Sequence, residues 1–170
     1  MKQSFLAVAV LVLSCLAMWP PRSATVFADP SVPKCDATLW KHVYHGPTFA
    51  TAQDRLKPIA ACKTVTGTLH FVRYEDDGDA HLRLDVDPQY KKLLNAKNAE
   101  EENMLVVEDM CDKEPTQNDT IKEGVCSGWH QGLYSESMDN KSVTVTGAYV
   151  EDEEHGWREI HPVSSISVGR

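Results

Sequence analysis

Two stretches of alternating apolar and polar residues near the end of the chain predict a pair of β-strands. In the first stretch, which begins at Ser142, Val143, Val145 and Tyr149 alternate with threonine and alanine, the period-two pattern of a strand with one buried face. After an acidic turn, four polar or aromatic side chains are spaced two residues apart: His155, Trp157, Glu159 and His161. Because alternate side chains of a strand point the same way, we expect these four on one face.

Residues 63–74 and 81–86 predict a β-hairpin earlier in the chain. The acidic segment between them contains Gly78, which can adopt the positive φ of a tight turn. Residues 104–110 predict a further strand, which is the third along the chain.

The second strand of this hairpin is predicted to have one buried and one exposed face. Leu82 and Leu84 alternate with His81, Arg83 and Asp85, so the two leucines are expected to face the core. The exposed face, with His81 and Arg83, is the predicted ligand surface if the protein is a binding domain.

Short helical segments are predicted before and between the strands. Leu39 and Val43 have helical spacing, and Asp54 is a suitable residue to begin a helix that Pro58 would keep short. The predicted helical ranges are 35–44, 54–61, 90–94 and 117–125.

The number and order of the predicted strands indicate an OB-like barrel. Five strands with a helix-forming segment between the third and the fourth match that order, whereas a lipocalin-like barrel needs about eight strands and a sandwich about seven. Val-Thr-Gly occurs at 65–67 and 145–147, and a glycine inside a strand often marks the bulge or bend that closes a small barrel. We therefore predict a mainly β fold, a small OB-like five-stranded barrel with short helical segments and disulfides.

The first 28 residues have the pattern of an export signal. Lys2 precedes an apolar run over residues 5–19, and Ala28 ends a V-F-A segment suited to cleavage. A membrane helix would instead need about 20 unbroken apolar residues. We predict a signal peptide at 1–28, a single OB-like domain at 29–170, and export, with the host's envelope deciding between secreted and periplasmic.

Cys15 supports a second interpretation of the same region. V-L-S-C, from Val12 to Cys15, is similar to a bacterial lipoprotein box, whose cysteine carries a lipid anchor. Such a box usually has leucine at the position of Val12, and here the apolar run also continues past the cysteine. Both departures favour cleavage after Ala28 over a lipid anchor at Cys15. We expect no membrane span in the mature domain.

The charge of the chain disfavours nucleic acid as a partner. The whole chain has a net charge of −8, and residues 1–28 contain two basic residues and no acidic one, so the predicted mature chain has 15 basic and 25 acidic residues and a net charge of −10. Like charge repels phosphate backbones and anionic lipid. The same balance is compatible with cation binding and with simple solubility.

Four cysteines remain after the predicted cleavage, and in an exported small domain an even number indicates disulfides. We predict the pairs Cys35–Cys62 and Cys111–Cys126, because each pair brackets a polar segment between strand-like stretches. A zinc site is the alternative, but the sequence has no C-x-x-C pair.

Histidines and carboxylates concentrate in the two acidic turns and beside them. These are ligands of Zn²⁺ or Mn²⁺ and are also the groups of acid–base hydrolysis. The candidate metal ligands are Asp77, Asp79, His81, His155 and His161. The candidate catalytic residues are His81, His155, Glu159 and His161. The competing interpretation is structural, because Asp and Gly suit tight turns and a carboxylate can orient a buried histidine.

Aromatic residues offer a second kind of binding surface. A stacking platform for bases or sugars could use Trp40, Tyr44, Tyr149 and Trp157. In a small β-barrel such side chains more often fill the core or close an open end. Arg83 and Trp157 are the residues predicted to contact a ligand.

Several segments together resemble a family of exported bacterial and archaeal proteins. They are C-D-A-T-L-W-K-H-V-Y-H, R-L-K-P-I-A-A-C-K-T-V-T-G-T, D-G-D-A-H-L-R-L-D, L-V-V-E-D-M-C and V-T-G-A-Y-V-E-D-E-E-H-G-W-R-E-I-H-P-V. The family has an E-H-G-W-x-E-I-H-P signature, and the resemblance extends from Cys35 to Val163. It implies export and an OB-like β-fold and adds no activity. Residues 45–52 form a longer stretch than the family pattern implies.

These observations favour an exported, non-catalytic binding or interaction domain whose ligand and partners the sequence does not identify. The alternative is a metal-dependent hydrolase, similar to a phosphodiesterase or nuclease, that uses the histidines and acids of the two turns. A divalent metal is the one cofactor that these residues suggest. The sequence has no G-x-S-x-G, no H-E-x-x-H and no phosphate-binding glycine loop.

Overall fold

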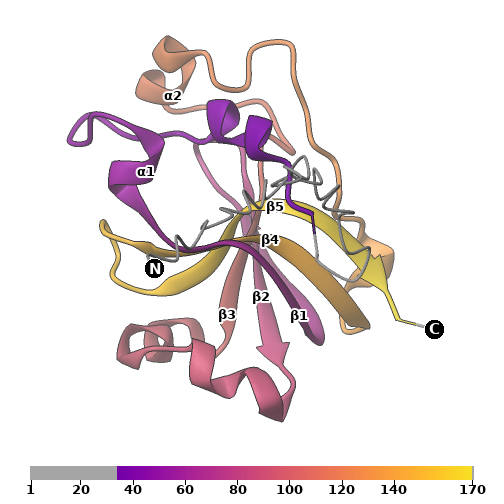
Figure 1. Cartoon of the computed structure of the whole chain (residues 1–170). Coiled ribbons are helices and arrows are strands. Elements are labelled where there is room, and N and C mark those ends of the chain that lie inside the picture. The colour runs from indigo at the N-terminus through magenta and orange to yellow at the C-terminus, as the bar shows by residue number, and fades with distance from the viewer. Residues whose placement is uncertain (1–33, 170) are drawn as a thin grey trace, which may run out of the picture.

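A computed structural model describes residues 34–169, and five β-strands form its framework (Figure 1). They are β1 (Leu56–Tyr74), β2 (Ala80–Val86), β3 (Leu105–Asp109), β4 (Ser142–Asp152) and β5 (Arg158–Val168). The strands close into a ring in the order β1-β2-β3-β5-β4. Neighbours are antiparallel except β3 and β5, which are parallel. The predicted mainly β fold with five strands is confirmed.

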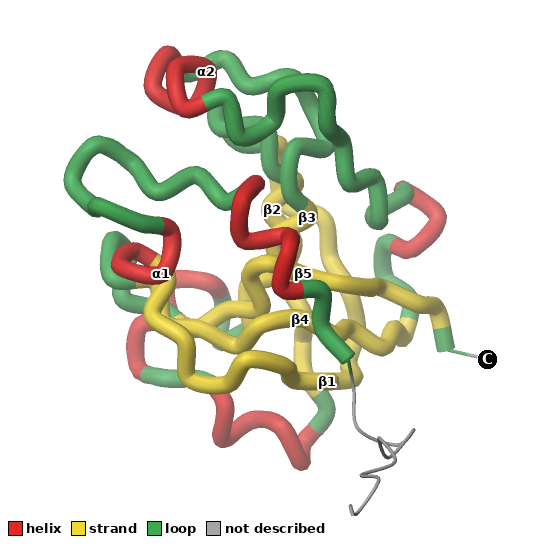
Figure 2. The backbone as a smooth tube through the Cα atoms, turned by 45° about the horizontal axis from the view of Figure 1, so that its top comes forward, coloured by secondary structure: helices red, strands yellow, loops and turns green. Residues whose placement is uncertain are grey.

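Six short helices lie before or between the strands within the described residues. They are η1 (Ala37–His42), α1 (Ala52–Arg55), η2 (Pro88–Leu93), η3 (Ala96–Glu101), α2 (Asn118–Glu123) and η4 (Glu136–Met138), of which the η segments are 3₁₀-helices. The segment with η2 and η3 lies on one side of the ring, and η1, α1 and α2 lie on the other, as Figures 1 and 2 show.

The predicted helix at 54–61 is only partly correct. Thr51 caps α1 by accepting a hydrogen bond from the Asp54 amide, but the helix ends at Arg55 and the chain continues directly into β1. Pro58 therefore lies inside a strand, where the pairing with β4 is irregular between Pro58 and Ala60. Proline has no amide hydrogen to donate to a neighbouring strand, so inside a strand it is tolerated where the pairing is irregular.

The glycines of the two Val-Thr-Gly triplets allow strands to approach closely. A Cβ atom at Gly67 would lie 2.3 Å from the carbonyl oxygen of Asp85, and one at Gly147 would lie 2.5 Å from the carbonyl oxygen of Pro162. The β4–β5 register also shifts on both sides of Gly147. The prediction of a bulge or bend is therefore confirmed at Gly147.

Two apolar clusters hold the fold together. The larger fills the ring and includes Val65, Leu69, Leu82, Leu84, Leu105, Val107, Val145 and Ile160. The smaller packs the segment before β1 and the segment after β3 against the ring, through Val43, Leu56, Met110, Ala148 and Val150. Complete burial of each Leu, Ile or Val side chain contributes about 1.5–3 kcal/mol.

Both predicted disulfides are confirmed. Cys35–Cys62 joins residues 27 apart and Cys111–Cys126 joins residues 15 apart, so the alternative of a zinc site at these cysteines is wrong. Each bridge stabilises the fold by about 3 kcal/mol, because it restricts the unfolded chain. None of the helices between residues 34 and 169 is long and apolar enough to cross a membrane. The predicted signal peptide and Cys15 lie outside the described residues.

Candidate functional site

A small enclosed space, here called the polar cavity, lies where α1, the β1–β2 turn and the β4–β5 turn meet. Its volume is about 20 Å³, enough for a single water molecule or ion. One guanidinium, six carboxyl groups, two imidazoles and an indole line it: Arg55, Glu75, Asp77, Asp79, Glu108, Asp152, Glu159, His155, His161 and Trp157. Charged groups are rarely buried in such number unless they are paired or bind an ion.

β5 places His161 and its orienting partners. Glu159 and His161 are two residues apart in the strand and lie on one face, as predicted. His161 Nδ1 lies 3.1 Å from Glu159 Oε1, and the Trp157 indole donates a 2.9 Å hydrogen bond to Glu159 Oε2. Because a carboxylate accepts hydrogen bonds, the neutral form of the His161 ring has its proton on Nδ1 and a lone pair on Nε2. This Nε2 has no hydrogen-bond partner among residues 34–169.

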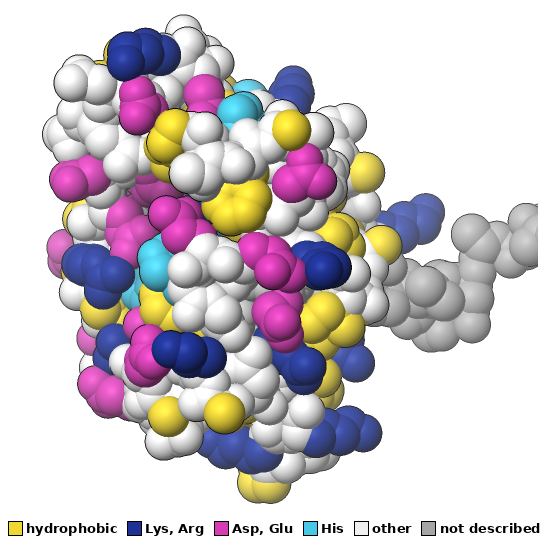
Figure 3. Space-filling model, turned by 90° about the vertical axis from the view of Figure 1, so that its left-hand side faces the viewer, with side chains coloured by type: hydrophobic (Ala, Val, Ile, Leu, Met, Phe, Trp, Pro, Cys, Tyr) yellow, Lys and Arg dark blue, Asp and Glu magenta, His cyan; other side chains and the backbone are white. Residues whose placement is uncertain are grey.

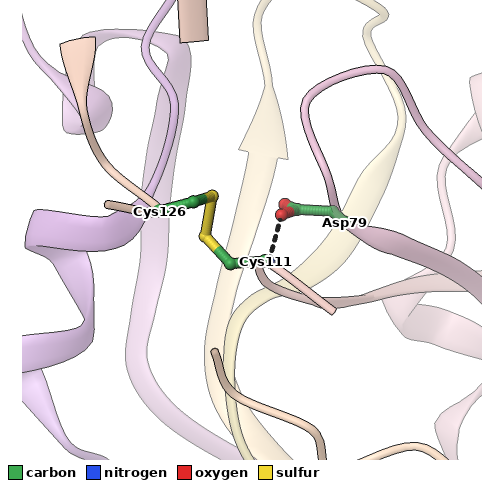
Figure 4. A group of neighbouring side chains, drawn as sticks. All are labelled: Asp79, Cys111 and Cys126. Atoms are coloured by element: carbon green, nitrogen blue, oxygen red, sulfur yellow. Dashed lines mark hydrogen bonds between the residues drawn. A yellow bond between two sulfur atoms is a disulfide. The ribbon is translucent and has the colours of Figure 1, made fainter. Parts of the chain in front are cut away.

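The β1–β2 turn brings Asp79 opposite this lone pair. Gly78 takes the positive φ of 101° that the turn requires. Asp79 accepts a 2.7 Å hydrogen bond from the Cys111 amide, as Figure 4 shows, and its other oxygen lies 3.7 Å from His161 Nε2. Burial, with the neighbouring charges of Asp77 and Glu108, raises the pKa of Asp79 well above its ordinary value. Cys111 and Cys126 also lie beside Asp79, but their sulfurs form a disulfide and are not thiolate ligands.

β3 contributes Glu108, which stands between the polar cavity and His81. The β2–β3 register pairs His81 with Glu108, and Glu108 Oε1 lies 2.7 Å from His81 Nδ1. Glu108 lines the cavity, and its Oε2 has no hydrogen-bond partner within the described part of the chain. Burial, together with Glu75 and Glu159, raises the pKa of Glu108 well above its ordinary value.

The opposite side of His81 is also bound by a carboxylate. His81 Nε2 lies 3.1 Å from Glu101 Oε2, which accepts a 2.7 Å hydrogen bond from Arg83 Nε, and Arg83 also binds Glu102. The prediction that His81 faces solvent is wrong, since η3 covers this face and the side chain is fully buried. The predicted ligand surface carrying His81 and Arg83 is therefore occupied by the chain's own glutamates.

Arg55, at the end of α1, supplies the buried guanidinium of the polar cavity. Its closest ion pair joins Nη1 to Glu154 Oε2 at 3.6 Å, which is too long for a hydrogen bond. Its Nε has no hydrogen-bond partner in residues 34–169. Burial acts to lower the pKa of Arg55, but the carboxylates around it, led by Asp152, raise it.

His155 lies in the turn before β5, so the prediction that it shares a strand face with Glu159 and His161 is wrong. It reaches them through Trp157, on which its ring stacks with 4.3 Å between centroids. Its Nδ1 lies 2.9 Å from Asp152 Oδ2, and this hydrogen bond raises the pKa of His155.

A larger open pocket adjoins the polar cavity. Its volume is about 440 Å³, and it shares Arg55, Glu75, Asp77 and His155 with the cavity. The remaining lining residues of this open pocket are Tyr44, Arg73, Tyr74, Asp76, Gln117 and Glu154. Figure 3 shows Asp, Glu and His side chains beside a hollow on this side of the molecule, with Lys or Arg side chains nearby.

Of the candidate residues from the sequence, the polar cavity gathers Asp77, Asp79, His155, Glu159, His161 and Trp157. His81 adjoins it through Glu108, and Arg83 is on the far side of Glu101. Sequence reasoning missed the other four lining residues, Arg55, Glu75, Glu108 and Asp152. A glutamate inside the apolar run L-V-V-E-D-M was a usable signal for Glu108, because charged side chains are rarely buried without a partner.

Two groups of residues have potential metal-ligand atoms that lie close together. In Glu75, His81 and Glu108, and again in Asp152, Glu154 and His155, such atoms lie within 4.8 Å of one another. The first group is nearly all buried, whereas Glu154 and His155 are exposed. Glu108 belongs to the buried group and also lines the polar cavity.

Comparisons of the chain with protein-family models, with curated proteins and with solved structures found no match. The function is therefore inferred from the geometry of the site.

Proposed function

We propose that this protein is an exported, non-catalytic binding domain with an OB-like barrel, and that the polar cavity binds a divalent cation. The closed order of five strands, with helices between β3 and β4, supports the barrel. Two disulfides are typical of proteins in oxidising compartments and support export.

The observation that carries the proposal is a convergence of unsatisfied polar atoms. Of the four buried side-chain atoms without a hydrogen-bond partner among the described residues, three belong to residues that line the polar cavity: Arg55 Nε, Glu108 Oε2 and His161 Nε2. Leaving such atoms unpaired costs about 1–3 kcal/mol each. In the proposed site the cation binds His161 Nε2, and water molecules around the cation donate a hydrogen bond to Glu108 Oε2 and accept one from Arg55 Nε.

The donor set suits Mn²⁺ or Zn²⁺. Histidine with carboxylates is a common ligand set for both, and a ligating histidine usually donates its other ring N–H to a carboxylate, as His161 does to Glu159. The 3.7 Å between His161 Nε2 and Asp79 Oδ2 is close to the roughly 3.5 Å that separates two ligands of a tetrahedral metal at about 2.1 Å each.

Charge supports the same conclusion. Six carboxyl groups surround a single guanidinium in the polar cavity, and burial with mutual repulsion raises the pKa of Asp79 and Glu108. A bound divalent cation favours the ionised form of these groups and offsets their repulsion.

The test is calorimetric titration of Mn²⁺ and of Zn²⁺ into purified, EDTA-treated protein with its disulfides intact. We expect saturable binding of a single cation per chain, which His161→Phe weakens at least about a hundredfold, since a ligand is lost. His70→Phe is the matched control, because His70 binds Asn140 and lines neither cavity nor pocket. Absence of stoichiometric binding, or equal binding by His161→Phe, would contradict the proposal.

Metal-dependent hydrolysis is the second candidate function, and the position of His155 favours it. This imidazole lies at the border between the polar cavity and the open pocket and is held by Asp152, as a general acid or base would be. Hydrolysis of bis(p-nitrophenyl) phosphate by the Mn²⁺-loaded protein, abolished in His155→Ala while the cation still binds, would support it. If the Mn²⁺-loaded protein hydrolyses the substrate no faster than free Mn²⁺ does, hydrolysis is rejected and only the binding function is retained.

A further inference from the structure

The open pocket has the size and the walls of a site for a small molecule. Its volume of about 440 Å³ falls within the range of roughly 300–1,000 Å³ that is usual for such sites. The rings of Tyr44 and Tyr74 are among its lining residues and offer flat apolar surface beside polar groups. The next question is which ligand chemistry the charged residues of the pocket select.

Arg55 connects the open pocket with the proposed cation site, since it lines both spaces. It is 6% exposed, and its Nε is unsatisfied among residues 34–169. A buried guanidinium that still has a free donor is suited to a ligand oxygen with negative charge, because charge-assisted bonds to phosphate or carboxylate are the strongest that arginine makes. Arg73 adds a second guanidinium at the rim, where it also binds Glu75.

The rest of the open pocket is acidic, which restricts when an anion can bind. Glu75, Asp76, Asp77 and Glu154 all line it. Their charges oppose an anion as long as no cation is present. A divalent cation in the polar cavity changes this balance, because the anion then meets a metal ion and Arg55 together.

We infer that the open pocket binds a small organic phosphate, with the phosphate group held by Arg55 and the bound cation and the organic part against Tyr44 and Tyr74. This inference rests on the proposed cation site. Phosphate is favoured over carboxylate because its three terminal oxygens can contact a metal ion and a guanidinium at the same time. Binding is therefore ordered: the cation is required before the phosphate.

Titration of phenyl phosphate and of inorganic phosphate into the purified protein tests the inference, once in EDTA and once with saturating Mn²⁺. Both ligands are expected to bind only with Mn²⁺, and phenyl phosphate to bind more tightly because its ring contacts tyrosine. Linkage requires that phenyl phosphate increase the affinity for Mn²⁺ by the same factor by which Mn²⁺ increases the affinity for phenyl phosphate. This reciprocity is measured on the unaltered protein and does not depend on the folding of a variant.

Substitutions then test whether the Arg55 guanidinium binds the phosphate group. Arg55→Lys is expected to weaken phenyl phosphate binding at least about tenfold when Mn²⁺ is titrated to saturation in the variant itself, because lysine keeps the charge but loses the planar fork. Arg73→Gln, at the exposed rim, gives a second measurement if Arg55→Lys folds poorly, and is expected to weaken binding about threefold. Arg158→Lys is the matched control, since Arg158 binds Glu151 and lines neither space.

The outcomes separate the two proposals. Mn²⁺ binding without any phosphate binding would overturn this inference and leave the cation site intact. Phosphate binding of equal strength in EDTA would overturn the ordered mechanism, and phosphate binding unaffected by Arg55→Lys and by Arg73→Gln would overturn the assigned site. Absence of Mn²⁺ binding would overturn both proposals.

Discussion

The two fully enclosed histidines of this protein, His81 and His161, have opposite surroundings. His81 lies between two carboxylates, with Glu108 2.7 Å from Nδ1 and Glu101 3.1 Å from Nε2. His161 has a carboxylate partner only on Nδ1, and its Nε2 is unsatisfied within the described residues. One imidazole therefore closes a network, whereas the other has a free lone pair directed at a cavity.

This difference shows why burial of a histidine does not by itself indicate a metal ligand. With a carboxylate beside each ring nitrogen, His81 has no nitrogen left for a metal or another ligand. His161 keeps one nitrogen for an external partner, while Glu159 fixes its orientation. Glu108 contacts both regions, because its Oε1 lies 2.7 Å from His81 Nδ1 and the residue also lines the polar cavity.

The largest expected effect is on stability, in the His81 network. His81→Phe leaves Glu101 without one partner and Glu108 without any, so the free energy of unfolding should fall by about 3–5 kcal/mol. Urea denaturation monitored by circular dichroism measures this loss. A loss below about 1 kcal/mol, the value of an exposed ion pair, would show that the network is not a buried salt bridge.

Another buried acid, Asp109, sharpens the comparison because it belongs to neither region. Asp109 Oδ2 accepts hydrogen bonds from two backbone amides, yet burial raises its pKa from 3.8 to about 6. A raised pKa on folding means that its stabilising contribution is present below pH 4 and is lost as the pH rises through 6, an effect of about 3 kcal/mol. Asp109→Asn should therefore be more stable than the unaltered protein at pH 7 and similar to it near pH 4. Urea denaturation at both pH values tests this, and a difference independent of pH would contradict it.

Metal addition should distinguish the two histidines directly. Mn²⁺ at a hundred times its dissociation constant should stabilise the protein by about 2.7 kcal/mol, since it binds the folded state. The gain should vanish in His161→Phe and persist in His70→Phe, as thermal denaturation with and without EDTA would show. Equal stabilisation of all three proteins would place the cation away from His161.

The smallest expected effect concerns the orientation of His161. Trp157→Phe keeps an aromatic ring but removes the indole N–H that binds Glu159, so Mn²⁺ affinity should fall about tenfold. Stability should change less than it does in His81→Phe. Unchanged Mn²⁺ affinity would mean that Glu159 needs only His161 to hold its position.

Several elements followed from local sequence alone. The alternation of Val143 and Val145, and of Leu82 and Leu84, predicted strands that the structure contains with those side chains buried. The spacing of Glu159 and His161 placed them on one face for the same local reason, since the strand period depends only on backbone geometry. Both disulfide pairs were also predicted correctly.

The failures occur where distant segments meet. Alternation placed His81 opposite Leu82, which is correct, but only the packing of η3 decided that this opposite face is buried. The sequence around Arg55 did not indicate a buried site residue. Arg55 ends the short helix α1, and only the packing of α1 against the strands brings its side chain to the polar cavity. His155 was assigned to a strand although Gly156, which follows it and has a φ of 85°, is a local signal that the turn continues to that point.

Most of the strands, the acidic hairpin turns and the disulfide pairs could be predicted from the sequence, because each depends on neighbouring residues, on composition or on cysteine spacing. Which polar atoms are left without a partner depends on the packing of distant segments. Ring closure brings Arg55 from α1, Glu108 from β3 and His161 from β5 around one cavity. Hydrogen-bond satisfaction is a property of all the segments that meet at a point, and a linear pattern does not contain it.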